Sequence, residues 1–213
     1  MTHKEPDRED LRVKRTQKLI LEAMIELTAQ KGFSKVTVRD ITEYAGINRA
    51  TFYRHYQDKF DLLDQYSKAL YELSDTTPET GPQILSKGID KQSAPGMVKM
   101  FEYIRANAKF YRAMLGKNGD SAFSEKIRQY MKKRIRRLLP EELRIEESSI
   151  DLYLSYVSSG SLGGLIWWLE HEMPYSPEEM AIISYQLNTA NLNTIIGQAQ
   201  SQKLFKENKN LEE

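Results

Sequence analysis

Regularly spaced apolar residues in the first part of the chain predict a helix that ends near residue 32. In the stretch RTQKLILEAMIELTAQKGF, apolar residues recur three and four positions apart and therefore share one helix face: Ile20, Ala23, Met24 and Leu27. Gly32 can adopt the left-handed conformation in which many helices end, and Phe33 follows it. The pattern indicates a helix with one buried face and a stop at Gly32.

Two short helices joined by a glycine are predicted to follow. Thr37 is a favourable N-cap, and Asp40, three residues later, completes a variant of the capping box. Gly46 is expected to stop this second helix after about eight residues, and Asn48 can cap a third helix almost at once. Two helices separated by so tight a turn form a helix-turn-helix.

The third helix is predicted to have an apolar face and a cationic face. Ile47, Phe52 and Tyr56 are placed on the side expected to pack inward. The opposite side is expected to be exposed, and it carries Arg49, Ala50, Tyr53 and Arg54. Arginine can donate to the edge of guanine or to a phosphate, and a small side chain lets the helix backbone approach. This side is therefore suited to a groove of DNA.

A fourth helix is predicted to begin after Asp58, an N-cap type, with Asp61 three residues later. Lys59 then lies in the first turn, where the helix dipole disfavours a cation. A phosphate bound at this helix start would accept hydrogen bonds from the ammonium group and from free backbone amides. We therefore expect Lys59 to contact a phosphate.

The next part of the chain predicts longer helices. Residues 74–96 are rich in Ser, Thr, Gly and Pro, so we expect a loop around at most a short helix. One amphipathic helix is predicted from Met97 to Leu115, and another over residues 121–139, ending before Pro140. The second of these carries a dense basic run: Lys126, Arg128, Lys132, Lys133, Arg134, Arg136 and Arg137. We interpret this run as a solvated face, with a second DNA-facing or anion-binding patch as the alternative.

The helix predicted around residues 150–173 contains three glycines, each of which costs about 1 kcal/mol relative to alanine. Small residues recur every four positions and leave a groove in which another helix could lie close: Ser155, Ser159, Gly160, Gly163 and Gly164. Residues 152–169 are uncharged and approach the length of a membrane span, but their serines and glycines favour a buried helix in a soluble bundle. A final helix is predicted to start with Ser176 as its cap and Pro177 at its first position.

Composition is that of an ordinary soluble globular protein. The chain has 213 residues, 40% of them hydrophobic and 29% charged, which is enough for one large domain or two small ones. The absence of cysteine excludes disulfides, thiolate catalysis and cysteine-ligated metal sites. The charged N-terminus lacks the apolar stretch of a secretory signal, so we expect a cytoplasmic location.

Positive charge is concentrated near one end of the chain, although the formal net charge is only +1. Residues 11–59 hold ten Lys and Arg against five Asp and Glu, so the other residues together are net negative. This asymmetry fits a small nucleic-acid-binding head on a body of opposite or neutral charge, although a solvated face could produce it too.

The sequence carries no constellation of an enzyme. It contains no G-x-S-x-G, H-E-x-x-H or glycine-rich phosphate loop, and its histidines are His3, His55 and His171. His171 lies between Glu170 and Glu172, which could suggest a metal, but a helix C-terminus favours a histidine without one. We therefore expect no catalytic residues, no cofactor and no bound metal.

The run VTVRDITEYAGINRATFYRHYQDKFDLL, preceded by a helix and KGF, resembles the DNA-binding domain of the TetR (tetracycline-repressor-like) family of bacterial transcription regulators. The resemblance covers about residues 12–70. It implies an all-α protein with a helix-turn-helix domain over residues 1–59 and a helical dimerisation and effector domain over residues 60–213. It further implies a homodimer that binds a palindromic operator, usually as a repressor, and is released by a small molecule of unknown identity.

The resemblance also assigns roles in DNA binding to individual residues of the helix-turn-helix. Thr37 and Arg39 would meet the backbone or groove of DNA, Arg49, Ala50 and Thr51 would approach bases, and Tyr53, His55 and Lys59 would hold phosphates. Arg54 occupies a position that varies in the family, and Asn48 stands where serine is common. Both asparagine and serine cap helices well, so this departure leaves the assignment intact. Tyr56 is assigned to the core, and His55 could instead be a partly buried neutral imidazole.

Two further sets of residues are assigned in the C-terminal domain. By resemblance, the last two helices form the dimer interface, with Ser159, Gly160, Gly163, Gly164, Ile183, Leu187, Ala190 and Thr194 as its candidates. Aromatic and apolar residues that could line an effector pocket are Phe101, Ile104, Tyr111, Tyr130, Tyr153, Tyr156, Trp167 and Trp168. Ordinary core packing is the alternative for each of these. The rival function is a helical protein-interaction module, or a regulator controlled by a partner protein in place of a small molecule.

Overall fold

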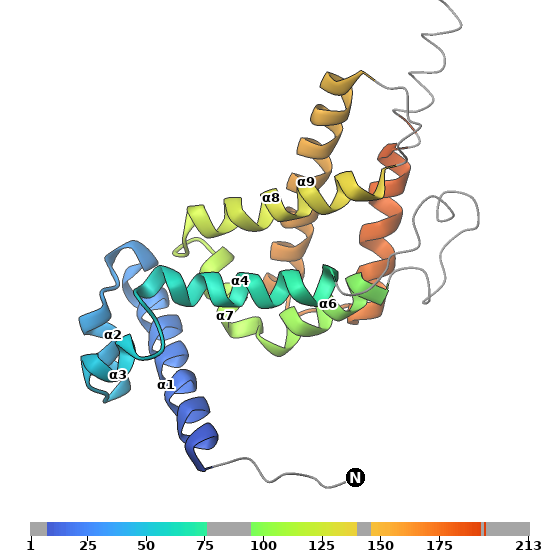
Figure 1. Ribbon diagram of the computed structural model, residues 1–213. Helices are drawn as coiled ribbons and strands as arrows, with labels where there is room; N and C mark the ends of the chain where they lie inside the picture. The colour runs from blue at the N-terminus through green and yellow to red at the C-terminus, as the bar shows by residue number, and fades with distance from the viewer. Residues whose placement is uncertain (1–7, 76–94, 140–145, 193, 195–213) are drawn as a thin grey trace, which may run out of the picture. The chain divides into compact units, whose positions relative to one another are not determined.

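The computed structural model describes residues 8–75, 95–139, 146–192 and 194, and every regular element in these ranges is helical (Figure 1). The helices are α1 (Arg8–Lys31), the 3₁₀ turn η1 (Phe33–Lys35), α2 (Val38–Ala45), α3 (Arg49–Tyr53), α4 (Lys59–Asp75), α6 (Pro95–Ala106), α7 (Ala108–Leu115), α8 (Ser121–Leu138) and α9 (Glu147–Glu170). A further helix covers residues 177–192 and is drawn in orange-red in Figure 1. The all-α class expected from the sequence is confirmed. None of the described helices combines the length and apolar character needed to cross a membrane.

The chain forms two compact units whose boundaries differ from the expected division at residue 59. The first unit comprises residues 1–69 together with 107–124, and the second comprises residues 70–106 together with 125–213. The single helix predicted from Met97 to Leu115 is interrupted at Asn107, which has φ −114° and ψ 28°. Asparagine is a weak helix former because its side chain competes for backbone hydrogen bonds. The interruption assigns α6 to one unit and α7 to the other.

In the first unit, α1 supplies the apolar face that its spacing predicted. Ile20, Ala23 and Met24 are completely buried, and Leu27 is buried beside them. Gly32 ends the helix with φ +82°, and its N–H donates to the carbonyl of Thr28 at 2.9 Å. The helix therefore ends where the sequence predicted, at a glycine with positive φ, but ψ 142° places Gly32 outside the left-handed helical conformation that was expected.

A loop that follows α7 braces the turn after α1 within the first unit. The backbone oxygen of Asn118 accepts from the N–H of Phe33 at 3.0 Å, and the side-chain amide of Asn118 donates to the carbonyl of Ala29 at 3.2 Å. Gly119 is required in this loop because a Cβ at its position would overlap the backbone oxygen of Met114. Contacts 89 residues apart in the chain thus hold the end of α1 in place.

Part of the core of the second unit lies where α9 meets α8 and the 177–192 helix. Tyr153, Leu154, Val157 and Leu192 form a buried cluster. The hydroxyl of Tyr153 donates to the carbonyl of Asn188 at 3.1 Å, and burial raises the pKa of Tyr153 to about 12. The buried indole of Trp168 donates to the carbonyl of Tyr175 at 2.8 Å.

Three cations of the basic run on α8 pair with neighbouring carboxylates. Lys132 pairs with Asp151 at 2.6 Å, and Arg136 pairs with Glu147 at 2.6 Å. Arg128 pairs with Glu125 within the helix, also at 2.6 Å. These ion pairs support the interpretation of the run as a paired, solvated face.

Candidate nucleic-acid interface

The second helix of the helix-turn-helix begins at the predicted capping box. The Thr37 hydroxyl oxygen accepts from the Asp40 N–H at 3.2 Å, and the Asp40 carboxylate accepts from the Thr37 N–H at 2.8 Å. Lys31 at the end of α1 donates to the same carboxylate at 2.7 Å. The hydrogen bond from Lys31, followed by those from Thr37, holds the pKa of Asp40 well below its usual range. Asp40 therefore joins the end of α1 to the start of α2.

Replacing Asp40 by asparagine is expected to lower the free energy of unfolding at neutral pH, because the charge partner of Lys31 is removed. A carboxyl whose pKa is depressed in the folded state stabilises that state above its unfolded pKa, and this contribution is lost as the pH falls below about 4. The Asp40→Asn variant should therefore lose less stability than the wild type between neutral and acid pH. Denaturant unfolding at several pH values measures this, with Glu43→Gln on the same helix as control. Parallel pH profiles for Asp40→Asn and the wild type would contradict the assignment.

The turn and the third helix also form as the sequence predicts. Gly46 takes the left-handed conformation, with φ 63° and ψ 33°, and the N–H of Ile47 donates to the carbonyl of Thr42 at 3.0 Å. The side-chain oxygen of Asn48 accepts from the N–H of Ala50 at 2.9 Å and caps α3. Phe52 is completely buried. The back of α3 is therefore held by packing while its start is held by a cap.

The opposite side of α3 is open to solvent. Arg49, Ala50, Tyr53 and Arg54 are all exposed, and 56% of the Tyr53 surface is accessible. The Tyr53 ring meets the Phe52 ring edge-on at 5.6 Å, so its direction is defined by a buried neighbour. Thr51 and His55 are half-buried. The two arginines and the tyrosine thus share one accessible surface, as a helix entering a DNA groove requires.

On α2, the two candidate DNA contacts differ in how far they are engaged. Arg39 is exposed, and its guanidinium pairs with Glu43 one turn later at 2.6 Å. Hydrogen bonding to this carboxylate raises the pKa of Arg39. Thr37 is exposed but is engaged in the capping box. A phosphate could replace Glu43 as the partner of Arg39, since the pair is solvated and such pairs contribute little stability.

Lys59 has a different environment from the one expected. Its ammonium group donates to the carbonyls of Phe33 at 2.8 Å, Ser34 at 3.2 Å and Val36 at 2.8 Å. It also lies 4.4 Å from the centre of the Phe33 ring, and burial lowers its pKa. Since an ammonium has three hydrogens and all three are directed at carbonyls, no donor is left for a phosphate. The structure makes Lys59 a brace between α4 and the turn after α1.

Replacing Lys59 by methionine is expected to lower the free energy of unfolding by about 2 kcal/mol, because three carbonyls lose a charged donor. Methionine keeps most of the chain length, so the change tests the ammonium group itself. Lys35→Met, at an exposed position in the same turn, is the matched control. Chemical denaturation followed by circular dichroism measures both. Equal stabilities of the two variants would contradict the bracing role.

The effector candidates from the sequence do not form one site. Phe101, Ile104, Tyr153 and Trp168 are buried in the core of the second unit, and Tyr130 is half-buried. Phe101 and Trp168 pack edge to face at 5.4 Å, as core aromatics do. Tyr111 is buried in the first unit, where its ring packs against Phe110 at 5.2 Å. Phe101 and Trp168 thus pack together, Tyr153 lies in the cluster with Leu154, Val157 and Leu192, and Tyr111 belongs to the first unit.

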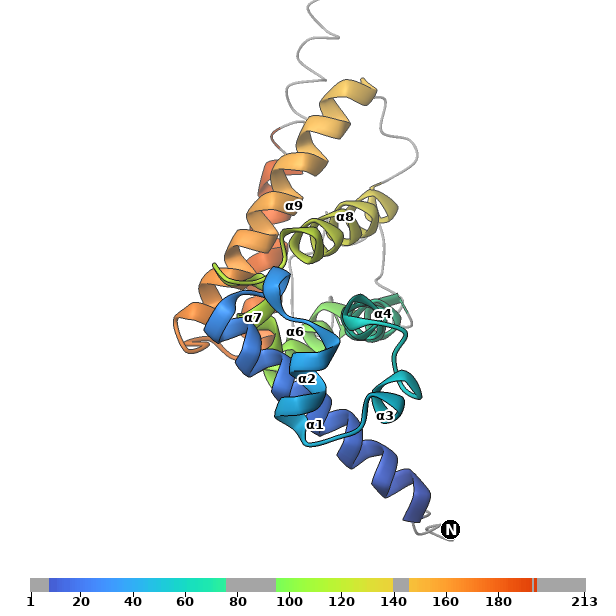
Figure 2. The same ribbon diagram turned by 90° about the vertical axis from the view of Figure 1, so that its left-hand side faces the viewer.

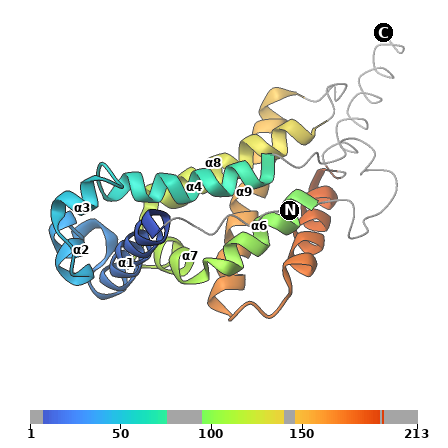
Figure 3. The ribbon, with the colours of Figure 1, turned by 60° about the horizontal axis from the view of Figure 1, so that its bottom comes forward.

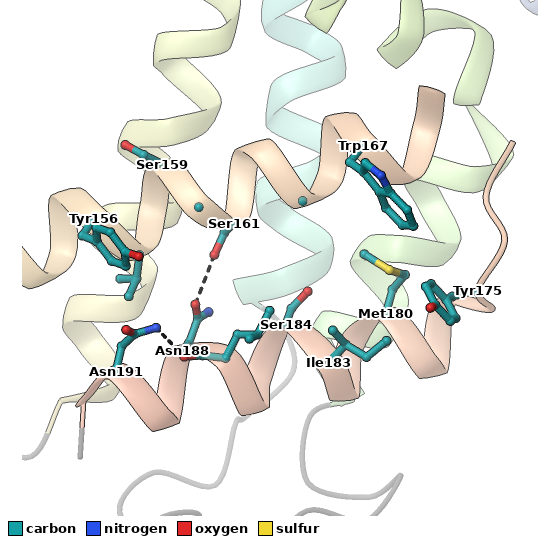
Figure 4. Close-up of a pocket in the computed structure, with 14 residues that line it drawn as sticks. Tyr156, Ser159, Ser161, Trp167, Tyr175, Met180, Ile183, Ser184, Asn188 and Asn191 are labelled. Atoms are coloured by element: carbon teal, nitrogen blue, oxygen red, sulfur yellow. Dashed lines mark hydrogen bonds between the residues drawn. The ribbon is translucent and has the colours of Figure 1, made fainter. Parts of the chain in front are cut away.

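Tyr156 and Trp167 instead line an open groove between α9 and the 177–192 helix, with a volume of about 610 Å³ (Figure 4). Figure 4 shows Tyr156 at one end of the groove and Trp167 with Tyr175 at the other. The groove also contains most of the predicted dimer residues: Ser159, Gly160, Gly164, Ile183 and Leu187. Outside the groove lining, Gly163, Ala190 and Thr194 are exposed. Two of the predicted effector-pocket residues therefore lie in the same open groove as five of the predicted dimer-interface residues.

Two family models match the chain. The model described as "Bacterial regulatory proteins, tetR family" matches residues 20–66, and "Transcriptional regulator C-terminal region" of the same family matches residues 91–189. The chain belongs to the TetR family of bacterial transcriptional regulators. The first match contains the whole helix-turn-helix, and the second contains α6 to α9 with most of the groove.

Curated relatives named as HTH-type transcriptional regulators align with the chain over limited lengths. The HTH-type transcriptional regulator YxbF of Bacillus subtilis is 42% identical over 55 residues, which are 25% of this chain and 14% of YxbF. YuxN of the same organism is 28% identical over 123 residues, 57% of this chain and 41% of YuxN. An HTH-type transcriptional regulator of Haemophilus influenzae is 22% identical over 163 residues, 72% of this chain and 75% of that protein. The chain thus matches less than half of the length of each of the two B. subtilis relatives.

Solved TetR-family structures share the fold. A TetR regulator from Streptococcus agalactiae superposes with a TM-score of 0.54 at 22% identity, covering 84% of this chain and 97% of that one. A regulator from Streptomyces coelicolor has a TM-score of 0.57 at 14% identity, covering 90% and 86%. At these identities the likeness concerns the fold alone.

Sequence reasoning missed two residues that matter in these surroundings. Asn118 braces the turn before the helix-turn-helix, and no local pattern could reveal a partner 89 residues away. Tyr175 lines the groove next to Trp167, with ring centres 6.2 Å apart. Its place directly before the Ser176 cap was the available signal, because residues at that position often pack back on their helix.

Proposed function

We propose that this TetR-family protein is an operator-binding regulator in which α3 enters the major groove of double-stranded DNA. The observation that carries the proposal is the division of α3 into two sides, with Phe52 fully buried and Arg49 and Tyr53 open to solvent. A helix held from behind can present these side chains at a defined angle. In this proposal Arg49, Ala50 and Thr51 approach bases, while Tyr53, His55 and Arg39 contact the DNA backbone. Lys59 is omitted, because its donors serve the fold.

Binding of labelled duplex DNA at two salt concentrations tests this proposal. Affinity should fall steeply as salt rises, because each phosphate contact releases condensed counterions. A helical interaction module, the rival function, would show no binding of duplex DNA at either concentration. That result, obtained with folded protein at low salt, would reject the proposal.

We propose further that a second copy of the chain covers the groove, so that the protein acts as a homodimer. Tyr156 and Leu187 are 68% and 61% exposed although both are apolar, and Trp167 lies on the same face. No atom outside the backbone of α9 lies within 4 Å of a Cβ built on Gly160, Gly163 or Gly164, among the described residues. The close contact that these glycines permit is thus left for another molecule. Tyr156 and Trp167 become interface residues in this proposal.

A homodimer explains how a short α3 can select an operator. One helix-turn-helix covers only a few base pairs, and two-fold symmetry presents two of them to the half-sites of a palindrome. An effector that favours a different separation of the two heads would weaken binding. Repression relieved by a small molecule is the form of control we propose, and control by a partner protein is the alternative. The dihydroxyacetone kinase operon activator DhaS has a similar fold (TM-score 0.52, 17% identity), so the fold is compatible with activation as well.

A further inference from the structure

The N-terminal half of α1 carries a cluster of exposed cations that the functions described so far do not use. Between residues 11 and 21 there are four basic side chains and no carboxylate. All four are exposed, and together they define the basic face of α1: Arg12, Lys14, Arg15 and Lys18. This face supplies four of the ten cations in the positively charged region of residues 11–59.

This half of α1 contributes little to the core of the first unit. From residue 11 onward, Ile20 is the first buried side chain of the helix, and Leu11 is 52% exposed. Figures 1 and 2 both show the start of α1 continuing past α2 and α3, with α3 the nearer of the two to that end. Figure 3 views α1 from its N-terminal end with α2 and α3 beside it. All of these elements belong to the first unit, so their arrangement is internal to it.

The basic face of α1 differs from the basic run of α8 in its pairing. On α8, Lys132 and Arg136 each meet a carboxylate of α9 at 2.6 Å. On α1, Lys18 has Glu22 at 3.8 Å, with both side chains more than half exposed. Solvated pairs at such separations contribute little and exchange readily for another anion. Lys132 and Arg136 of α8 are therefore held by α9, whereas the Lys18–Glu22 pair of α1 lies within one helix and in solvent.

We propose that the basic face of α1 binds phosphates of the DNA backbone that flanks the half-site read by α3. This inference rests on the proposed DNA-binding function and adds a second contact surface to it. Arg12 and Lys18 are six residues apart, or about 9 Å along a helix. That length corresponds to two to three steps between successive phosphates of one strand, which are about 3.4 Å each along the duplex axis. Exposed Leu11 would lie against sugar rings between them.

The test compares Arg12→Gln/Arg15→Gln with the wild type in binding a random-sequence duplex over a range of salt. Loss of two phosphate contacts should reduce the slope of log affinity against log salt by about 2, and the wild type's advantage should shrink about tenfold between about 50 and 200 mM salt. Lys99→Gln/Lys133→Gln removes two exposed cations from the second unit and should leave the slope unchanged. Arg12→Lys/Arg15→Lys should restore it, because lysine also neutralises phosphate.

Each outcome separates this inference from the proposed function. If the wild type binds duplex DNA and Arg12→Gln/Arg15→Gln retains the full slope, the basic face does not contact phosphates, although α3 still can. If the wild type binds no duplex at low salt, the proposed function itself fails. Binding to vesicles that contain anionic lipid is measured in parallel. If Arg12→Gln/Arg15→Gln binds duplex DNA as the wild type does but binds these vesicles more weakly, the basic face of α1 serves a membrane surface and the inference is overturned. Circular dichroism melting should give the same midpoint for all variants, because the changed side chains are exposed.

Discussion

Arg49→Ala is expected to reduce discrimination between the operator and sequences altered in the half-site by about 5- to 150-fold. The estimate follows from the 1–3 kcal/mol that a bidentate arginine contributes against a wrong base. Arg49 is exposed in the first turn of α3, next to the Asn48 cap, so its side chain is available without rearrangement. Alanine is compatible with the helix, and the buried back of α3 is untouched. The loss should therefore appear as relaxed specificity in a folded protein.

The measurement begins with an operator selected from random DNA by the wild type. Affinities of both proteins are then compared for that operator and for single-base variants of it. Arg105→Ala, at an exposed position of α6 in the second unit, removes an equal charge far from α3 in sequence and should preserve the preference. If Arg49→Ala lowers affinity equally for every duplex, Arg49 contacts the backbone and the base-reading role is wrong.

Leucine at Gly160 or Gly164 is expected to separate the homodimer while leaving each protomer folded. The sites are open within the described part of the chain, so a single protomer can accommodate the larger side chain. Removing glycine from a helix interior should even raise protomer stability by up to about 1 kcal/mol. Across the proposed interface the same side chain has no space. Overpacking costs about 1–3 kcal/mol per site, and two-fold symmetry introduces it twice, so dimerisation should weaken about 30-fold or more.

Sedimentation at several protein concentrations measures this effect, because dissociation depends on mass action. Ser148→Leu adds the same side chain to an exposed position in the first turn of α9 and should leave the dimer intact. An intact Gly160→Leu dimer would show that the groove is covered by something other than a second copy. Operator binding should decline together with dimerisation, since two half-sites need two heads.

The helix-turn-helix could be predicted closely because its determinants are local. The Thr37 box joins residues three positions apart, Asn48 caps an amide two positions away, and Gly46 needs only its own positive φ. The sides of α3 follow from helical periodicity once Phe52 is placed in the core. The exposure of Arg49 and Tyr53 follows from the same reasoning.

Long-range contacts account for the places where the structure differs from the sequence-based predictions. The position of Lys59 in a first helical turn suggested a bound anion, but carbonyls more than twenty residues earlier in the chain take its hydrogens. The apolar face predicted from Met97 to Leu115 suggested one helix. The helix is instead interrupted at Asn107, where the boundary between the two units falls. A residue's spacing along the chain does not reveal which distant group will meet it.

The two tryptophans illustrate what each level decides. Helical periodicity by itself determined that neighbours such as Trp167 and Trp168 point about 100° apart, and that α1 to α3 begin and end at their caps and glycines. Only the tertiary structure decided that Trp168 is sealed in the core while Trp167 lines an open groove. The physical reason is range: hydrogen bonds of caps and turns close within a few residues, whereas burial depends on which surfaces of distant helices meet.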